Sequence, residues 1–157
     1  MRIWKVAPML LFTLLLSITG CGDSTPEKKG SVKTDLVVTP ESEFEVPEKV
    51  QTELNKLRQS PKGGHKAVID EDRIYLIVAL GERRTGGHSV EIKRAELVDN
   101  TELHVYAQEE APPPDSFTTQ VISYPVSVSS VQIESPSTIK NFVFHVKEAK
   151  DNKTPDR

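Results

Sequence analysis

The chain has 157 residues, of which 20 are basic, 23 are acidic and 36% are hydrophobic. This length allows one domain of ordinary size, and the formal charge of −3 disfavours a nucleic-acid partner. Cys21 is the single cysteine, so no disulfide can form within the monomer and the domain must be stabilised by its core alone.

Residues 1–20 have the organisation of a secretory signal. Arg2 and Lys5 form a basic start, an apolar stretch follows, and small residues precede Cys21. The apolar stretch is shorter than the roughly 20 residues of a membrane-spanning helix. Its end, Ile-Thr-Gly-Cys, resembles the lipobox of bacterial lipoproteins, which predicts cleavage after Gly20 and acylation of Cys21. The alternative is an ordinary signal peptide that is cleaved near a cysteine.

Acylation of Cys21 predicts where the mature chain resides. A diacylglyceryl cysteine carries two acyl chains, and two chains hold a protein firmly at a membrane where one holds it marginally. We therefore expect a lipid-anchored protein of the cell membrane or outer envelope that faces outside the cytoplasm. Residues 21–45 are polar and predict a disordered tether, although Leu36–Thr39 could add an edge strand.

The remainder predicts an α+β domain at residues 46–147, mostly β, in which an antiparallel sheet or small sandwich is covered by one helix. Apolar residues at Val46, Val50, Leu54 and Leu57 recur at helical spacing and predict that helix. Residues 148–157 predict a disordered tail. Strand character is found in Lys66–Ile69, Ile74–Leu80, a segment from His88 to Leu97, Leu103–Gln108, Thr118–Ser123, Val126–Ile133 and Lys140–Val146.

Irregularities and loops are also predicted within this β region. The alternation of apolar residues shifts at Lys93-Arg94, where a β-bulge would account for it, and again at Ser129-Ser130. Asp99-Asn100 predicts a turn, and the three prolines within Glu109–Ser116 predict an extended loop.

The segment Ile74–Leu80 contains seven consecutive apolar residues and predicts a strand buried on both faces. A polar loop, Gly81–Gly87, follows it and leads into the strand from His88, which we expect to pair with the first. In such a loop Gly86 and Gly87 are expected to have backbone angles closed to other residues. Arg83 and Arg84 are expected to project into solvent, as a solvated turn or as a binding surface.

Motifs for catalysis are incomplete. Residues 86–91, GGHSVE, have Glu91 where the nucleophile elbow of lipases needs a glycine. Gly81–Gly87 has the glycine spacing of a phosphate loop but lacks its lysine and its following helix. The histidines at 65, 88, 104 and 145 have no close spacing, although they could converge across a sheet. We therefore expect no enzymatic activity, no metal and no cofactor.

Two blocks carry a family resemblance. Residues 81–92, GERRTGGHSVEI, resemble the Gly-x-x-x-Thr-Gly-Gly-aromatic signature of the PrcB C-terminal domain family. Residues 111–128, APPPDSFTTQVISYPVSV, resemble its second block, which has a proline-rich loop, a Thr-Gln step and a Tyr-Pro strand. The similarity covers roughly Val46 to Ile133, and His88 stands where the family usually has tyrosine.

The resemblance implies a small β-rich domain, without catalytic residues of its own, that serves as an accessory subunit of a surface protease complex. We expect a lipid-anchored protein that binds a protein partner, with an extracytoplasmic protease as the candidate. The alternatives are a protease inhibitor that acts through its loops and a ligand- or metal-binding lipoprotein. The expected partner-binding residues are Arg83, Arg84, Thr85, Gly86, Gly87 and His88 in one loop and Pro112, Pro113 and Pro114 in a second.

Overall fold

The structure is a computed structural model, and it describes residues 31–149. The predicted signal peptide, the predicted lipidation site Cys21, the first part of the predicted tether and residues 150–157 of the predicted tail lie outside the described residues. No helix within residues 31–149 is long and apolar enough to cross a membrane.

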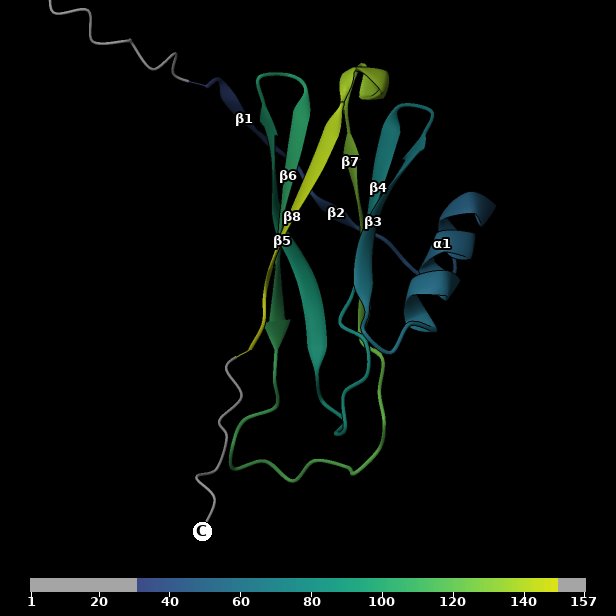
Figure 1. Cartoon of the computed structure of the whole chain (residues 1–157), viewed down its shortest axis with the longest axis vertical. Helices are drawn as coiled ribbons and strands as arrows, with labels where there is room; N and C mark the ends of the chain where they lie inside the picture. Colours follow the sequence, from purple (N-terminus) through teal and green to yellow (C-terminus); the bar gives the residue numbers. More distant parts are fainter. Residues whose placement is uncertain (1–30, 150–157) are drawn as a thin grey trace, which may run out of the picture.

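Two four-stranded sheets pack face to face, with one helix against the outer face of the second (Figure 1). In spatial order the first sheet contains β1 (Lys33–Leu36), β5 (Ser89–Val98), β6 (Glu102–Glu110) and β8 (Asn141–Lys147). The second contains β2 (Thr39–Pro40), β7 (Val126–Gln132), β4 (Arg73–Ala79) and β3 (Gly64–Asp70), and the helix is α1 (Glu48–Arg58). Neighbouring strands are antiparallel except β6 and β8, which are parallel. The predicted mostly-β sandwich with one covering helix is confirmed.

Strand β4 is buried on both faces, as predicted for Ile74–Leu80. Ile74, Leu76 and Val78 point into the core between the two sheets. Tyr75 and Ile77 point the other way and pack under α1. Burying an aliphatic side chain of this size stabilises the fold by about 1.5–3 kcal/mol relative to leaving it exposed. The uninterrupted apolar run is therefore explained by a strand that has a sheet on one side and a helix on the other.

The predicted helix is confirmed, since Val50 and Leu54 of α1 are buried at the spacing that the sequence indicated. Pro47 lies at the N-cap, immediately before the first helical residue. Glu48 occupies the first turn and Arg58 the last, an order that suits the helix dipole.

The strand that follows β4 does not pair with it, so the prediction of a hairpin was wrong. β4 is hydrogen-bonded to β3 on one edge and to β7 on the other, which leaves no edge for β5. β5 instead pairs with β1 and β6 in the opposite sheet. The loop Gly81–Gly87 therefore crosses from one sheet to the other.

The segment expected to be a tether contributes two short strands. β1 pairs with β5 in the first sheet, and β2 pairs with β7 in the second. Val32 and Asp99 add two hydrogen bonds, from Val32 N to Asp99 Oδ1 and from Asp99 N to Val32 O, each 2.9 Å. Backbone pairing along two sheet edges orders a segment whose side chains are mostly exposed.

The two predicted shifts in the alternation of apolar residues have different outcomes in the structure. The register between β5 and β6 shifts between Ile92 and Arg94, which confirms the predicted bulge. No shift occurs at Ser129 and Ser130, because β7 keeps one register along β4. Both serines are buried since β7 is covered on both faces, and the Ser130 hydroxyl donates to a carboxylate oxygen of Glu41 at 2.6 Å.

The boundaries of the long loop also differ from the expectation. β6 continues through Glu109 and Glu110, two residues that were expected to belong to the loop. The predicted strand Thr118–Ser123 is absent from the described structure apart from a single bridge between Ser123 and Arg83. Residues 111–125 therefore form one irregular connection from β6 to β7.

Candidate partner-binding site

The two predicted binding loops lie together at one end of the sandwich (Figure 1). Gly86 N donates to Thr119 O at 3.0 Å, and Arg83 and Ser123 exchange two backbone hydrogen bonds of 2.9 Å. A Cβ atom placed on Gly87 would lie 3.2 Å from the ring of Pro112. The fold thus brings the loop Gly81–Gly87 and the proline-containing connection into one surface, which we call the loop end.

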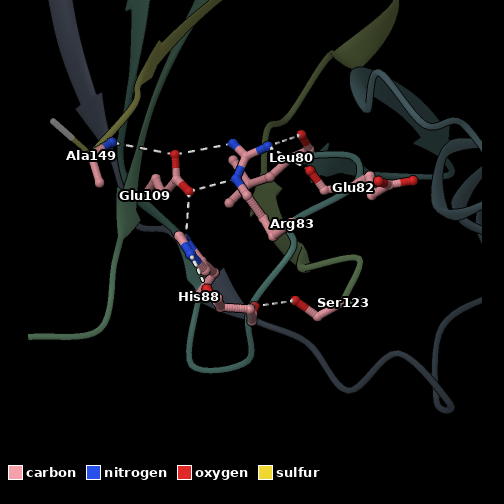
Figure 2. A network of polar contacts seen from close by, with 8 residues as sticks. Leu80, Glu82, Arg83, His88, Glu109, Ser123 and Ala149 are labelled. Carbon is pink, nitrogen blue, oxygen red and sulfur yellow. Dashed lines mark hydrogen bonds and ion pairs between the residues drawn. The ribbon is translucent and has the colours of Figure 1, made fainter. Parts of the chain in front are cut away.

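A buried carboxylate, Glu109, lies at the centre of the polar contacts at the loop end (Figure 2). Alternation along β6 directs Glu109 inward, after Leu103, Val105 and Ala107, and its side chain is only 4% exposed. Arg83 donates to both carboxylate oxygens, from Nε to Oε1 at 2.7 Å and from Nη2 to Oε2 at 3.1 Å. This bidentate geometry is the strongest arrangement between a guanidinium and a carboxylate.

Two more groups complete the hydrogen bonding of the Glu109 carboxylate. His88 Nδ1 lies 3.0 Å from Oε1, and the backbone N–H of Ala149 donates to Oε2 at 3.3 Å. Because His88 Nδ1 faces a carboxylate, it carries the proton, and Nε2 then accepts from the Thr85 hydroxyl at 3.2 Å. His88 therefore connects the loop to β6 through both of its ring nitrogens.

The surroundings of Glu109 act on its pKa in opposite directions. Burial acts to raise the pKa, whereas the hydrogen bonds from Arg83 and His88 and the charge of Arg83 act to lower it. The lowering effects prevail, so the pKa of Glu109 lies below its ordinary value. At neutral pH the carboxylate is ionised and balances the charge of Arg83.

The two arginines have different roles, which corrects the expectation that both project into solvent. The side chain of Arg83 is 22% exposed, and its Nη1 also donates to the carbonyl oxygen of Leu80 at 2.9 Å. Arg84 is exposed, and its side chain makes no hydrogen bond or ion pair with residues 31–149. Arg83 therefore holds the loop in place, and Arg84 is presented to solvent.

The glycines of the loop are required for two different reasons. Gly87 has φ +87°, which confirms the expectation of a backbone conformation that favours glycine. Gly86 does not have a positive φ, and the space around it is limited because a Cβ there would lie 2.6 Å from the Thr119 hydroxyl. Gly81 combines both constraints, with φ +77° and a Cβ position only 2.4 Å from the carbonyl oxygen of Pro61.

Apolar side chains on the long connection were not singled out from the sequence. Phe117 is fully exposed, and Val121, Ile122 and Tyr124 are each exposed by more than a third. They lie on the same segment that hydrogen-bonds to the loop Gly81–Gly87. A polar pocket of about 400 Å³ at the loop end is lined by Glu82, Arg84, Thr85, His88, Glu109 and Glu148 among others. Tyr124 adjoins it, because its hydroxyl donates to Glu82 Oε2 at 3.4 Å.

The three prolines of the second predicted binding loop differ in exposure. Pro113 and Pro114 are exposed and Pro112 is half-buried next to Gly87.

Of the histidines at 65, 88, 104 and 145, only His88 belongs to the Glu109 network. His104 and His145 contact one another on β6 and β8, and His65 stacks on Phe144. Within residues 31–149 no group of three or more histidine, cysteine or acidic side chains is placed to hold a metal ion.

Comparison with known proteins gives one match. The family model described as PrcB C-terminal matches residues 74–132, which run from β4 to the end of β7. This segment includes both loops of the loop end together with Glu109 and its partners Arg83 and His88. No curated protein and no solved structure matches the chain significantly. The resemblance to the PrcB C-terminal family, predicted from two sequence blocks, is therefore confirmed over residues 74–132.

Proposed function

We propose that the chain is a lipid-anchored, non-catalytic protein whose loop end binds a protein partner, as an accessory or regulatory subunit of an extracytoplasmic protease. The observation that carries this proposal is the exposure of Phe117, Val121, Ile122 and Tyr124 on one short segment. Contiguous exposed apolar side chains mark interaction surfaces more often than single ones do.

The framework beneath these side chains favours binding. Backbone hydrogen bonds join their segment to the loop Gly81–Gly87, and the ion pair of Arg83 and Glu109 joins that loop to β6. A surface ordered before binding loses less conformational entropy when the partner docks. Aromatic residues and arginine often dominate binding energy, and the loop end presents Phe117, Tyr124 and Arg84.

A protease complex is the favoured context because of the family. The PrcB C-terminal match spans β4 to β7 and includes every residue of the loop end that we assign to binding. The family resemblance implies an accessory subunit without its own catalytic residues, and both ring nitrogens of His88 are engaged in positioning contacts.

The predicted anchor is compatible with this arrangement. The described chain enters the sandwich at the start of β1, at the opposite end from the loop end (Figure 1). A lipid on Cys21 would therefore hold the described domain through the start of β1, which lies at the opposite end from the loop end.

Capture of the partner from intact cells tests the binding surface. A crosslinking pulldown with the Phe117→Ser/Ile122→Ser variant should recover at least about tenfold less partner than the wild type, because buried aromatic anchors carry much of an interface's energy. Phe44→Ser is the control, since Phe44 is also a highly exposed phenylalanine but lies between β2 and α1. Unchanged capture by the double variant, with a normal melting curve, would contradict the proposed surface.

Identity and activity of the captured partner test the proposed context. Mass spectrometry should identify a protease or a subunit bound to one, and adding the purified chain should leave the rate of that protease unchanged or raise it. A chain that slows the protease by itself is an inhibitor, and this outcome would refute the accessory role.

The anchor has its own test. Cys21→Ala should abolish the lipid label and remove the processed protein from the membrane fraction. A processed Cys21→Ala protein that still fractionates with membranes would refute lipidation at this residue.

A further inference from the structure

Two histidines meet on the outer face of the first sheet, outside the loop end. β6 and β8 run parallel, and the register pairs His104 with Val143 and Tyr106 with His145. His104 and His145 are therefore diagonal neighbours on one face of the adjacent strands β6 and β8. Their ring nitrogens, Nδ1 of His104 and Nε2 of His145, are 3.1 Å apart, and the two rings are stacked with their planes inclined by 25°.

Neighbouring side chains orient both rings. Tyr106 stacks on His145 with ring centroids 4.7 Å apart, and Arg94 lies over Tyr106 at 4.4 Å from its centroid. On the other side Glu102 Oε2 lies 3.6 Å from His104 Nε2. A carboxylate beside the outer nitrogen of a histidine favours a proton there, which leaves the inner nitrogen, Nδ1, as a lone-pair donor.

We propose that His104 and His145 form a binding site for a divalent first-row transition-metal cation, with Cu²⁺ bound most tightly. Two nitrogens bound to one ion at about 2.0–2.1 Å are roughly 2.9 Å apart in square-planar geometry and roughly 3.3 Å apart in tetrahedral geometry. The separation of 3.1 Å lies between these values. In the metal-free pair His145 Nε2 donates to the lone pair of His104 Nδ1, so metal binding requires the hydrogen of His145 to move to its Nδ1 and each ring to turn its lone pair to a shared position. His145 is exposed on the sheet surface, which leaves its ring room to turn.

The site would be an exchangeable one. Because residues 31–149 contain no group of three metal-ligating side chains, two imidazoles would leave other positions on the ion to water or to a ligand from another molecule. Imidazole ligands suit copper, nickel and zinc, and copper is the tightest of these for a given set of ligands. This inference is independent of the proposed protease context.

Titration of the untagged full chain with Cu²⁺ tests the site, with binding followed by calorimetry. His104→Gln and His145→Gln should each weaken Cu²⁺ binding at least tenfold, because each variant loses chelation by the pair. His65→Gln is the control, since His65 stacks on Phe144 outside the pair, and its affinity should equal that of the wild type. Every variant keeps Cys21 and the same chain ends, so binding at those groups contributes equally.

Spectroscopy of the wild-type chain supplies a test that needs no variant. Electron paramagnetic resonance of the Cu²⁺ complex should show coupling to two nitrogens, and substoichiometric Cu²⁺ should broaden the ring NMR signals of His104 and His145 before those of His65 and His88. Affinities of the two glutamine variants within twofold of the wild type would overturn the proposal. Equal broadening of all four histidines would overturn it as well, and would leave the pair as a hydrogen-bonded contact only.

Discussion

Replacing Glu109 by Gln removes the central charge of the loop end while keeping the size of the side chain. Removing one partner of a buried ion pair costs about 3–5 kcal/mol, whereas an exposed pair contributes about 0–1 kcal/mol. Glu109 is 4% exposed and Arg83 22% exposed, so water reaches only part of the guanidinium. We therefore expect Glu109→Gln to lower the free energy of unfolding by about 2–3 kcal/mol at pH 7.

Urea denaturation provides the measurement, and Glu110→Gln is the matched control. Glu110 is the next residue and its side chain is 56% exposed beside Lys93. The same change of charge there should alter the free energy of unfolding by less than about 0.5 kcal/mol. A loss of less than 0.5 kcal/mol in Glu109→Gln would refute the reasoning that this carboxylate holds the loop.

The pH dependence of the Glu109→Gln effect gives a second check. The folded-state pKa of Glu109 is lowered, so its contribution is complete above the unfolded pKa of about 4.3 and is lost as the pH falls through the folded value. The difference in unfolding free energy between wild type and variant should therefore be constant from pH 7 to about pH 5 and shrink below about pH 4. A difference that persists unchanged at pH 3 would show that the charge of Glu109 is not its cause.

Four other substitutions test separate parts of the structure. Arg83→Ala should destabilise the chain by about 2 kcal/mol. Arg84→Ala should leave the melting temperature of the chain unchanged and weaken partner capture roughly tenfold. Equal melting temperatures of the two variants would contradict a structural role for Arg83 and an exposed position for Arg84. Gly81→Ala should cost at least about 2 kcal/mol in urea denaturation, because it combines a positive φ with a backbone clash, and a neutral result would refute the close approach to Pro61. Leu54→Ala should cost about 2–5 kcal/mol through the cavity left under α1, and a loss below 1 kcal/mol would contradict that packing.

Elements defined by local pattern were predictable from the sequence. The apolar run of β4, the helical spacing of Val50 and Leu54 and the phase shift at Lys93-Arg94 each depend on the side chains of one segment. Periodicity reports directly which faces of such a segment are buried. These features were therefore predicted with nearly correct limits.

Pairing between distant segments was not predictable in the same way. Assigning β4 and β5 to one hairpin followed from their closeness in the chain, but the two edges of β4 are taken by β3 and β7. Residues 21–45 were expected to be a tether with at most one edge strand, at Leu36–Thr39, because β1 and β2 are ordered by backbone pairing with β5 and β7 and their side chains carry little apolar pattern.

The candidate site was predicted only in part. Both loops were identified, whereas the ion pair that joins the loop Gly81–Gly87 to β6 through Glu109 was not, because Glu109 was assigned to a loop. One signal was available: Glu109 continues the inward phase of Leu103, Val105 and Ala107, and an acid at a buried position requires a cationic partner. The pattern therefore indicated a cationic side chain next to Glu109, and in the structure this partner is Arg83.

The crossing of the N-terminal segment between the sheets has a mechanical consequence. β1 runs antiparallel to β5 from the end of the sandwich opposite the loop end, and β2 then joins the other sheet (Figure 1). Tension between a membrane anchor before β1 and a partner at the loop end would pull along the strand axis. The hydrogen bonds between β1 and β5 would then be loaded together in shear, while the attachment of β2 to β7 shares the load with the second sheet. Such a strand resists pulling better than one that is peeled away bond by bond, so a load applied between the start of β1 and the loop end would meet the β1–β5 pairing in its more resistant direction.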